Sequence, residues 1–321
     1  MSRRDCNLGT PLVSACSKGH VECVRLLLEH GVDMENQRNC GCRHAIPLVA
    51  ACLKGHVECA RLLREHGVQD SYPDARITPL WVACATGDAN HARSLLEAGA
   101  KMKMARKDEC SPLWIACQNG FAECASLLLA SGHPANGKYK TFFIKNETPL
   151  FVACKNGHVD CVRALVDHGA DMERATDTGA TPLLIACKQG NIDCARLLLD
   201  RGAIVDKANG MGSTPLRVAC KDGVAHCARL LIERGAKVNR AGRYGRTPLH
   251  EACYNNRRST ALVLLEHGAD PCKKDDEGMR PAPYAWRGIY VDRQLAEAVS
   301  LAARDRNAGI ERLRNIQWHG E

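Results

Sequence analysis

Cysteine is the residue type whose number and spacing most strongly suggest chemistry in this chain. The 321 residues include 19 cysteines, and a thiol can form a disulfide, bind a metal ion or act as a nucleophile. Cysteines make up about 6% of the chain, which is below the density of small disulfide-bonded scaffolds. Their positions therefore have to show whether they do chemistry or fill space.

Most of the cysteines recur at two fixed positions. Eight follow an alanine, namely Cys16, Cys52, Cys84, Cys117, Cys154, Cys187, Cys220 and Cys253. Six more come seven residues after one of these, namely Cys23, Cys59, Cys124, Cys161, Cys194 and Cys227. Equivalent thiols in neighbouring units would lie about 10 Å apart, which is beyond the roughly 7 Å that a disulfide can bridge. We interpret these cysteines as small apolar core residues.

Five cysteines fall outside this pattern, namely Cys6, Cys40, Cys42, Cys110 and Cys272. Cys40, Cys42 and His44 share one linker, and Cys6 corresponds to Cys42 one period earlier, so zinc binding there is an open alternative. Cys-x-Cys is not a usual spacing for structural zinc, which favours ordinary surface thiols. We expect no metal site and no cofactor.

A proline at the start of each apolar run gives the period of the chain. These prolines are Pro11, Pro47, Pro79, Pro112, Pro149, Pro182, Pro215 and Pro248, and their commonest spacing is 33 residues. The copy that begins Thr148-Pro149-Leu150 continues with Ala153-Cys154 and Gly157. The pattern resembles the ankyrin-repeat family, with its Thr-Pro-Leu-His-x-Ala signature. That resemblance predicts an all-α solenoid of stacked helix-turn-helix units with hairpin-like linkers.

The residues of one copy support the same structure on physical grounds. Thr148 suits a helix N-cap and Pro149 the first helical position, while Gly157 accepts the left-handed conformation that ends a helix. Apolar residues at helical spacing predict a second helix that ends at Gly169. Ordering 33 residues costs about 1.5 kcal/mol each, more than one helix pair recovers, so the units must stack.

The array is expected to span residues 5–305. Its repeats begin near residues 10, 46, 78, 111, 148, 181, 214 and 247, and a degenerate, more polar repeat begins near residue 280 as a terminal cap. Residues 306–321 form an amphipathic segment with Ile310, Leu313 and Ile316 at three-residue spacing. We expect this segment to fold back onto the cap, with a partner-binding tail as the alternative.

Large aromatic side chains occupy one repeat position in three consecutive copies. They are Trp81, Trp114 and Phe151, where the family has histidine. The resemblance places this helix on the concave face, so the three rings could form a binding hot spot, although packing between repeats explains them equally well. The same side is expected to carry further candidate partner-binding residues, namely Lys54, Lys155, Lys188, Lys221 and Tyr254.

Charge and the lack of enzyme motifs indicate the class of function. The net charge of +8 and the recurring lysines favour a partner with an acidic surface or segment, although acidic residues interrupt the basic face. No phosphate-binding loop, His-Glu-x-x-His or Gly-x-Ser-x-Gly motif is present. By family resemblance we expect a non-enzymatic protein-interaction module or scaffold that binds its partner on the concave face and the hairpin tips.

Two other functions remain open. Ser300-Leu301 resembles the start of a SOCS box, which would make the chain a substrate adaptor of a ubiquitin ligase, but the cysteine and Leu-Pro motif that should follow are missing. The basic groove could instead bind nucleic acid or polyphosphate, which we consider unlikely.

The cellular context and the first repeat add two expectations. No apolar stretch long enough for a membrane helix and no signal peptide are visible, so we expect an intracellular protein of the cytoplasm or nucleus. The helices of the first repeat carry no strongly polar face beyond Ser14 and Ser17. An apolar end of this kind predicts self-association through that repeat.

Overall fold

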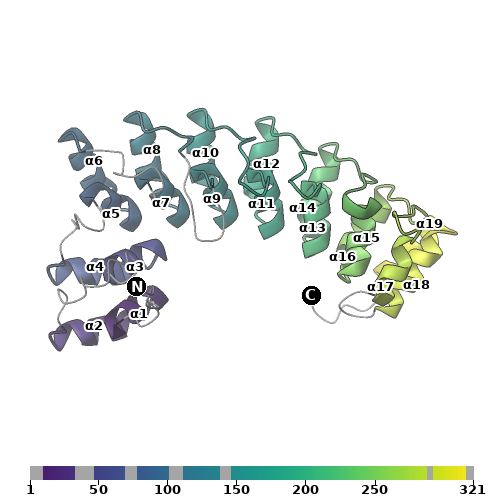
Figure 1. Cartoon of the computed structure of the whole chain (residues 1–321), viewed down its shortest axis with the longest axis horizontal. Helices are drawn as coiled ribbons and strands as arrows, with labels where there is room; N and C mark the ends of the chain where they lie inside the picture. Colours follow the sequence, from purple (N-terminus) through teal and green to yellow (C-terminus); the bar gives the residue numbers. More distant parts are fainter. Residues whose placement is uncertain are drawn as a thin grey trace, which may run out of the picture. The chain divides into compact units, whose positions relative to one another are not determined.

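The computed structural model describes residues 10–32, 47–68, 78–100, 111–137, 146–287 and 292–315, and these contain helices, turns and no β-strand. The first helix of each unit is α1 (Pro11–Lys18), α3 (Pro47–Leu53), α5 (Pro79–Thr86), α7 (Pro112–Asn119), α9 (Pro149–Asn156), α11 (Pro182–Gln189), α13 (Pro215–Asp222), α15 (Pro248–Tyr254) or α17 (Pro281–Arg287). The second is α2 (Val21–Glu29), α4 (Val57–Glu65), α6 (Ala89–Glu97), α8 (Ala122–Ala130), α10 (Val159–Asp167), α12 (Ile192–Asp200), α14 (Ala225–Glu233), α16 (Arg258–Glu266) or α18 (Arg293–Ala302). A last helix, α19 (Arg306–Arg314), follows (Figure 1). The predicted all-α solenoid of helix pairs is confirmed.

The first helices begin and end as their sequences predict. In α11 the Thr181 hydroxyl accepts a hydrogen bond from the Leu184 N–H at 3.2 Å, and Pro182 stands at the first helical position. Gly190, with φ 78°, ends this helix in the left-handed conformation. In the eighth unit Asn256 takes that conformation with φ 57°. Asparagine tolerates positive φ better than other non-glycine residues, which explains the exchange.

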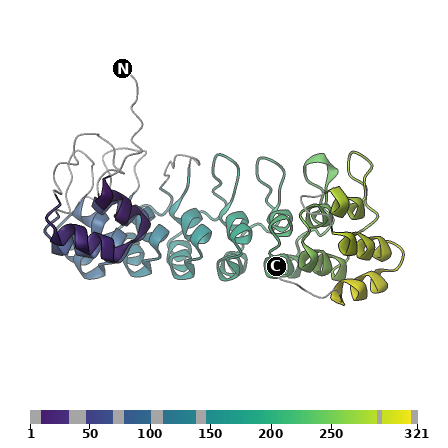
Figure 2. The same cartoon turned by 90° about the horizontal axis from the view of Figure 1, so that it is seen from below.

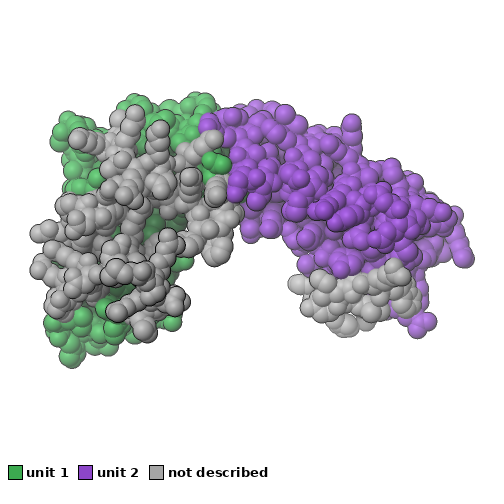
Figure 3. Space-filling model, in the orientation of Figure 1, with its two compact units in different colours: residues 1–153, 160–170 green, residues 154–159, 171–321 purple. Residues whose placement is uncertain are grey.

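The chain divides into two compact units (Figure 3). Unit 1 comprises residues 1–153 and 160–170, and unit 2 comprises residues 154–159 and 171–321. In unit 1, α1 packs on α3 and α5 packs on α7. In unit 2, α13 packs on both α11 and α15, and α14 packs on α12 and α16. Within unit 2 the first helices and the second helices therefore form two layers, and the hairpin linkers project beyond them (Figure 2).

The repeated cysteines lie in the core, as the repeat pattern predicts. All eight Ala-Cys side chains are buried, and the described cysteines are free thiols. Cys23 is an exception because it is exposed, as is Cys272. Among the described residues no group of three or more metal-binding side chains comes together. Cys6, Cys40, Cys42, His44 and Cys110 lie outside the described residues.

Thiols of neighbouring repeats meet in pairs that the sequence argument did not consider. Cys84 on α5 is hydrogen-bonded to Cys124 on α8, and Cys187 on α11 is hydrogen-bonded to Cys227 on α14. Each pair joins the Ala-Cys position of one repeat to the later cysteine of the next. The two cysteines of a pair hold different positions in their repeats, so the regular spacing of the sequence does not reveal the contact. Burial raises the pKa of the Cys154 thiol, so this core thiol stays protonated at neutral pH.

Polar side chains also join consecutive repeats at the carbonyl ends of the first helices. The Asn191 side-chain amide donates to the Cys154 carbonyl at 2.9 Å and to the Lys155 carbonyl at 3.1 Å. The Arg257 side chain donates to the Lys221 carbonyl at 3.3 Å. The last carbonyls of a helix have no partner within that helix. Each such contact satisfies them from the next repeat.

The end of the described chain is packed onto the array. Helix α19 lies against α18 and α16, and its Leu313 is 1% exposed. Arg314 of α19 binds Glu266 of α16 at 2.6 Å. The described part of the amphipathic segment thus folds back onto the last repeats, whereas Ile316 lies outside the described residues.

We expect Asn191→Ala to lower the free energy of unfolding by about 1–2 kcal/mol, because two carbonyls at the end of α9 lose their donor. Urea denaturation followed by circular dichroism measures this loss. Val224→Ala is the matched control, since Val224 holds the same position one repeat later and makes no side-chain hydrogen bond. Equal losses in the two variants would show that the amide bonds contribute nothing.

Candidate partner-binding surfaces

The three aromatic residues proposed as a binding stripe are buried. Each is the third residue of its helix, and Trp81, Trp114 and Phe151 are 1%, 4% and 1% exposed. Of the two interpretations left open for these rings, their burial favours packing between repeats, because at this position the side chain enters the space between helices. A partner cannot desolvate a ring that is already out of water. We assign these residues to packing.

The proposed lysines lie at the surface, and three of them share one position. Lys155, Lys188 and Lys221 directly follow the Ala-Cys dipeptides of α9, α11 and α13. We call these three residues the lysine row. Lys188 and Lys221 are exposed, Lys155 is half-buried, and all three belong to unit 2. Within the described residues neither Lys188 nor Lys221 has a carboxylate partner.

The remaining proposed residues lie apart from the row or extend it. Tyr254 of α15 holds the next position in the register of the lysine row and is half-buried. Lys54 is exposed, but it follows α3 in unit 1 and stands one residue later in its repeat. The structure therefore brings together Lys155, Lys188, Lys221 and Tyr254 in one unit, without Lys54 or the buried rings.

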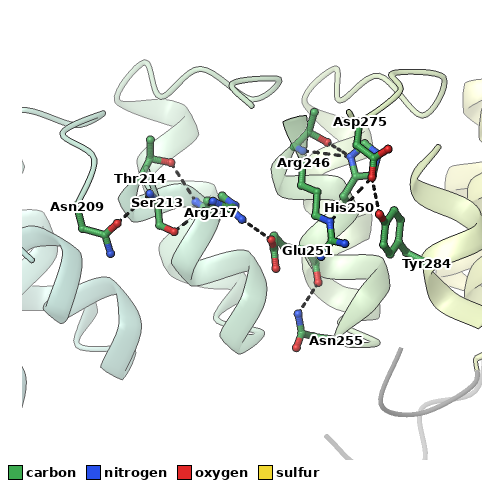
Figure 4. Close-up of polar contacts among 11 residues, drawn as sticks. Asn209, Ser213, Thr214, Arg217, Arg246, His250, Glu251, Asn255, Asp275 and Tyr284 are labelled. Atoms are coloured by element: carbon green, nitrogen blue, oxygen red, sulfur yellow. Dashed lines mark hydrogen bonds and ion pairs between the residues drawn. The ribbon is translucent and has the colours of Figure 1, made fainter. Parts of the chain in front are cut away.

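A buried ion pair replaces the large aromatic residues between α13 and α15. Arg217 is the third residue of α13, the position that Trp81 holds in α5. Its guanidinium donates to the Glu251 carboxylate at 2.6 Å and to the Ser213 hydroxyl at 3.2 Å (Figure 4). The side chains of Arg217 and Glu251 are only 11% and 9% exposed. The contact between α13 and α15 therefore contains a buried ion pair in place of an aromatic ring.

Arg246 is surrounded by tyrosine rings beside this pair. Its guanidinium carbon lies 4.7 Å from the ring centre of Tyr284 and 5.7 Å from that of Tyr254. Its Nε lies 3.9 Å from the Asp275 carboxylate, which accepts a hydrogen bond from the Tyr284 hydroxyl (Figure 4). Burial and the Asp275 carboxylate raise the pKa of Tyr284 to about 12. Burial alone would raise the pKa of Asp275, but its hydrogen bonds outweigh burial and lower it.

Burial and the Thr247 N–H favour the neutral form of His250. Its Nδ1 accepts a hydrogen bond from the Thr247 N–H at 3.1 Å, and its Nε2 donates to the Met279 carbonyl at 3.1 Å. Nδ1 can accept only while it carries no proton. Burial is the main cause that lowers the pKa of His250, and the nearby Arg246 charge lowers it further.

Comparison with protein families agrees with this geometry. A family model described as "Ankyrin repeats (3 copies)" matches residues 2–74, 34–108, 66–139, 113–209 and 204–275. The chain belongs to the ankyrin-repeat family. Ankyrin-repeat domains are interaction scaffolds that generally bind other proteins. No curated protein matches the sequence.

Two solved ankyrin-repeat domains resemble the fold. The human ASB11 ankyrin-repeat domain is 29% identical with a TM-score of 0.61, and the match covers 70% of this chain and 97% of that one. The ankyrin-repeat domain of Bcl-3, a member of the IkappaB protein family, is 24% identical with a TM-score of 0.59. That match covers 74% of this chain and 98% of the Bcl-3 domain. In the described residues, no helix combines the length and apolarity needed to cross a membrane.

Sequence reasoning missed the polar packing around α13 and α15. Arg217 was visible as a basic residue at an aromatic position, and Glu251 follows a histidine in the next repeat. Arg217 is the third residue of α13, whereas Glu251 is the fourth residue of α15. An alignment of equivalent positions therefore does not reveal that the two residues pair. This offset of one position is the signal that could have identified the pair.

We expect Glu251→Ile to lower the free energy of unfolding of unit 2 by about 3–5 kcal/mol, because Arg217 is left buried without its partner. Adding Arg217→Leu should recover most of the loss, because no buried charge then remains. Each of the two positions then carries the residue type that α11 has there, namely Leu184 at the third position and Ile185 at the fourth. Urea denaturation of the single and double variants measures both changes. A double variant no more stable than Glu251→Ile would contradict this account.

We expect the stability of unit 2 to fall as the pH is lowered through about 6.5. His250 has a lowered pKa in the folded chain, so its contribution is present above its unfolded pKa and is lost below it. His250→Gln keeps the acceptor of the capping box but does not titrate. Thermal melts between pH 7.5 and pH 5 should show a smaller pH effect in this variant. Parallel curves would show that His250 is not responsible.

Proposed function

We propose that unit 2 binds an acidic protein segment along its first-helix face through the lysine row. The observation that carries this proposal is the register of Lys155, Lys188 and Lys221 in three consecutive helices. Lys188 and Lys221 are exposed and have no carboxylate partner in the described chain. Exposed cations without carboxylate partners, here Lys188 and Lys221, attract an anionic segment and steer its approach.

The surroundings of the row support the same partner. Uncharged side chains follow two of its lysines, namely Asn156 after Lys155 and Gln189 after Lys188. Asp222 follows Lys221, but one of its carboxylate oxygens is buried. Equivalent positions of stacked helices lie about 10 Å apart, so an extended acidic segment places a carboxylate near each lysine every third residue. The overall charge of +8 favours the same class of partner.

Protein is favoured over nucleic acid as the partner because the row offers charge without stacking. Recognition of single-stranded nucleic acid normally combines a basic groove with exposed aromatic rings. The rings expected on this face, Trp81, Trp114 and Phe151, are buried. The nucleic-acid alternative is therefore retained only as a possible outcome of the binding test.

We expect Lys188→Glu with Lys221→Glu to weaken binding of a fluorescein-labelled glutamate dodecapeptide by roughly five- to thirtyfold, because two attractions become repulsions. Fluorescence anisotropy at two salt concentrations measures the affinity, and the salt dependence should fall in this variant. Lys54→Glu is the matched control, because Lys54 is an exposed lysine of unit 1 outside the row.

Unchanged affinity in the double variant, or equal losses in the Lys54 control, would rule out the row as the binding site. Oligodeoxythymidylate and inorganic polyphosphate serve as competitors of the same charge. If either displaces the peptide at a much lower concentration than unlabelled peptide does, the row recognises polyphosphate chemistry instead of carboxylates.

Self-association through the first repeat is a separate proposal that rests on α2. Leu26 of this helix is 54% exposed, which is unusual for a large apolar side chain in a repeat helix. Most other apolar residues of the first repeat are covered, including Leu12 at 0% and Val13 at 6%. Analytical ultracentrifugation of Leu26→Lys against the wild type tests this proposal, and an equally monomeric wild type would contradict it.

A further inference from the structure

The hairpins of unit 2 expose two large side chains next to each other. Four described hairpins close with the same backbone hydrogen bond, from the N–H of Thr176, Asn209, Gly242 and Asp275 to the carbonyl four residues later. Two residues into these hairpins stand Thr178, Met211, Tyr244 and Glu277. Met211 is 59% exposed and Tyr244 is 53% exposed. Large apolar or aromatic groups so far out of the core suit contact with a partner.

Tyr244 also has an unfavourable backbone conformation. Its φ is 63° and its ψ is 24°, and it stands in a short 3-10 turn, η3 (Arg243–Gly245). At the equivalent position Thr178, Met211 and Glu277 have ordinary negative φ, and the positive φ falls on the glycine that follows. A bulky residue at positive φ is strained. The ring is not packed in the core, so burial does not offset this strain.

The buried pair of Arg217 and Glu251 explains why this hairpin differs. In the neighbouring hairpins a side chain at the first position holds the turn, since Asn209 accepts from the Met211 and Ser213 N–H groups. Asp275 does the same for Glu277 and Met279. Gly242 has no side chain to do so, and a Cβ there would lie 2.2 Å from the Arg217 guanidinium. The Gly212 carbonyl oxygen would lie 3.0 Å from the same Cβ. Arg217 and this carbonyl together favour glycine at this position, and the turn forms without its usual acceptor.

The two exposed side chains belong to one continuous edge. The Gly210 N–H donates to the Thr178 carbonyl at 3.0 Å, and the Asp276 N–H donates to the Tyr244 carbonyl at 3.1 Å. A Cβ on Gly212 would lie 3.7 Å from the Arg243 nitrogen, so the tips that carry Met211 and Tyr244 are also in contact. We call Met211, Arg243 and Tyr244 the tip patch.

Arg243 gives the tip patch its charge. Its guanidinium carbon lies 4.8 Å from the Tyr244 ring centre. Within the described residues it has no carboxylate partner. Acidic side chains do lie on the next hairpin, at Asp276 and Glu277, on the side of Tyr244 away from Met211. An anion is therefore drawn to the side of the patch between Tyr244 and Met211.

We infer that Tyr244 is the affinity anchor for an acidic protein segment that carries an apolar side chain. The apolar side chain lies between Met211 and Tyr244, and a neighbouring carboxylate pairs with Arg243. This inference rests on the proposed function, because the same segment continues onto the lysine row. Lys221 lies near the end of the eight-residue helix α13, which is about 12 Å long, and Met211 lies on the hairpin before this helix. An extended dodecapeptide is about 40 Å long, which is enough to reach from the lysine row to the tip patch.

The first test measures strain. Tyr244→Gly removes the unfavourable conformation, so we expect its urea midpoint to equal or exceed that of the wild type. Glu277→Gly is the matched control, because this position has ordinary φ and glycine there only adds freedom to the unfolded chain. The control should lose stability. A clear loss of stability in Tyr244→Gly would mean that the ring holds the hairpin together, which overturns the inference.

The second test measures binding with two peptides. One is the glutamate dodecapeptide, and the other is a dodecapeptide of alternating glutamate and leucine. Tyr244→Gly should weaken binding of the alternating peptide by about tenfold or more and change binding of the glutamate peptide by less than about twofold. Lys188→Glu with Lys221→Glu should weaken both peptides.

The outcomes separate the two proposals. If the glutamate peptide fails to bind the wild type while Tyr244→Gly weakens the alternating peptide, the lysine row is wrong and the anchor stands. If Tyr244→Gly leaves the affinity for the alternating peptide unchanged, or that peptide does not bind the wild type, the anchor is wrong.

Discussion

The structure depends on one constraint: no helix pair of this chain can bury its own apolar face. Each pair has only a few apolar side chains, and the next pair must cover them. This accounts for the burial of Trp81 and Phe151, each of which is the third residue of the first helix of its repeat. It also accounts for the hydrogen-bonded thiols of Cys187 and Cys227, which come from different repeats. These aromatic rings and thiols lie where consecutive repeats meet and are therefore not available at the surface.

The same constraint is met differently around α13 and α15. There the contact between repeats contains the buried pair of Arg217 and Glu251 in place of an aromatic ring. A buried ion pair offsets the cost of its desolvation only when its geometry is good and further hydrogen bonds satisfy the charged groups. The guanidinium occupies the space of a side chain at Gly242, and the hairpin above it adopts the turn that displays Tyr244. The ion pair packed between α13 and α15 is thus linked to the exposed ring of Tyr244 on the hairpin through one residue, Arg217.

Much of the fold could be predicted from the sequence because its causes are local. Thr181, Pro182 and Gly190 determine where α11 begins and ends through caps and backbone preferences that need no tertiary contact. The 33-residue spacing of prolines then required these units to stack. The exposure of Trp81 could not be predicted in this way. Whether the third residue of a helix faces solvent or the next repeat depends on the packing between helices. A tryptophan in the sequence is compatible with either arrangement.

The lysine row and the tip patch differ in how far the sequence could identify them. Lys188 and Lys221 are one period apart, so their shared position could be read directly, and the structure adds that both are exposed. Tyr244 gives no such signal, because its importance lies in a backbone angle that follows from Arg217 in the preceding repeat. An alignment of equivalent repeat positions identifies residues that share one position, such as the lysine row. It does not find pairs that cross from one position to another.

The central claim is that the aromatic groups on the first helices serve packing and that contact surfaces lie on the lysines and hairpin tips. Hydroxyl-radical footprinting with mass spectrometry tests it directly, with each residue's rate normalised to its rate in the urea-unfolded chain. We predict strong protection of Trp81 and Trp114 and little protection of Met211 and Tyr244. Tryptophans modified as readily as Met211 in the folded protein would contradict this account.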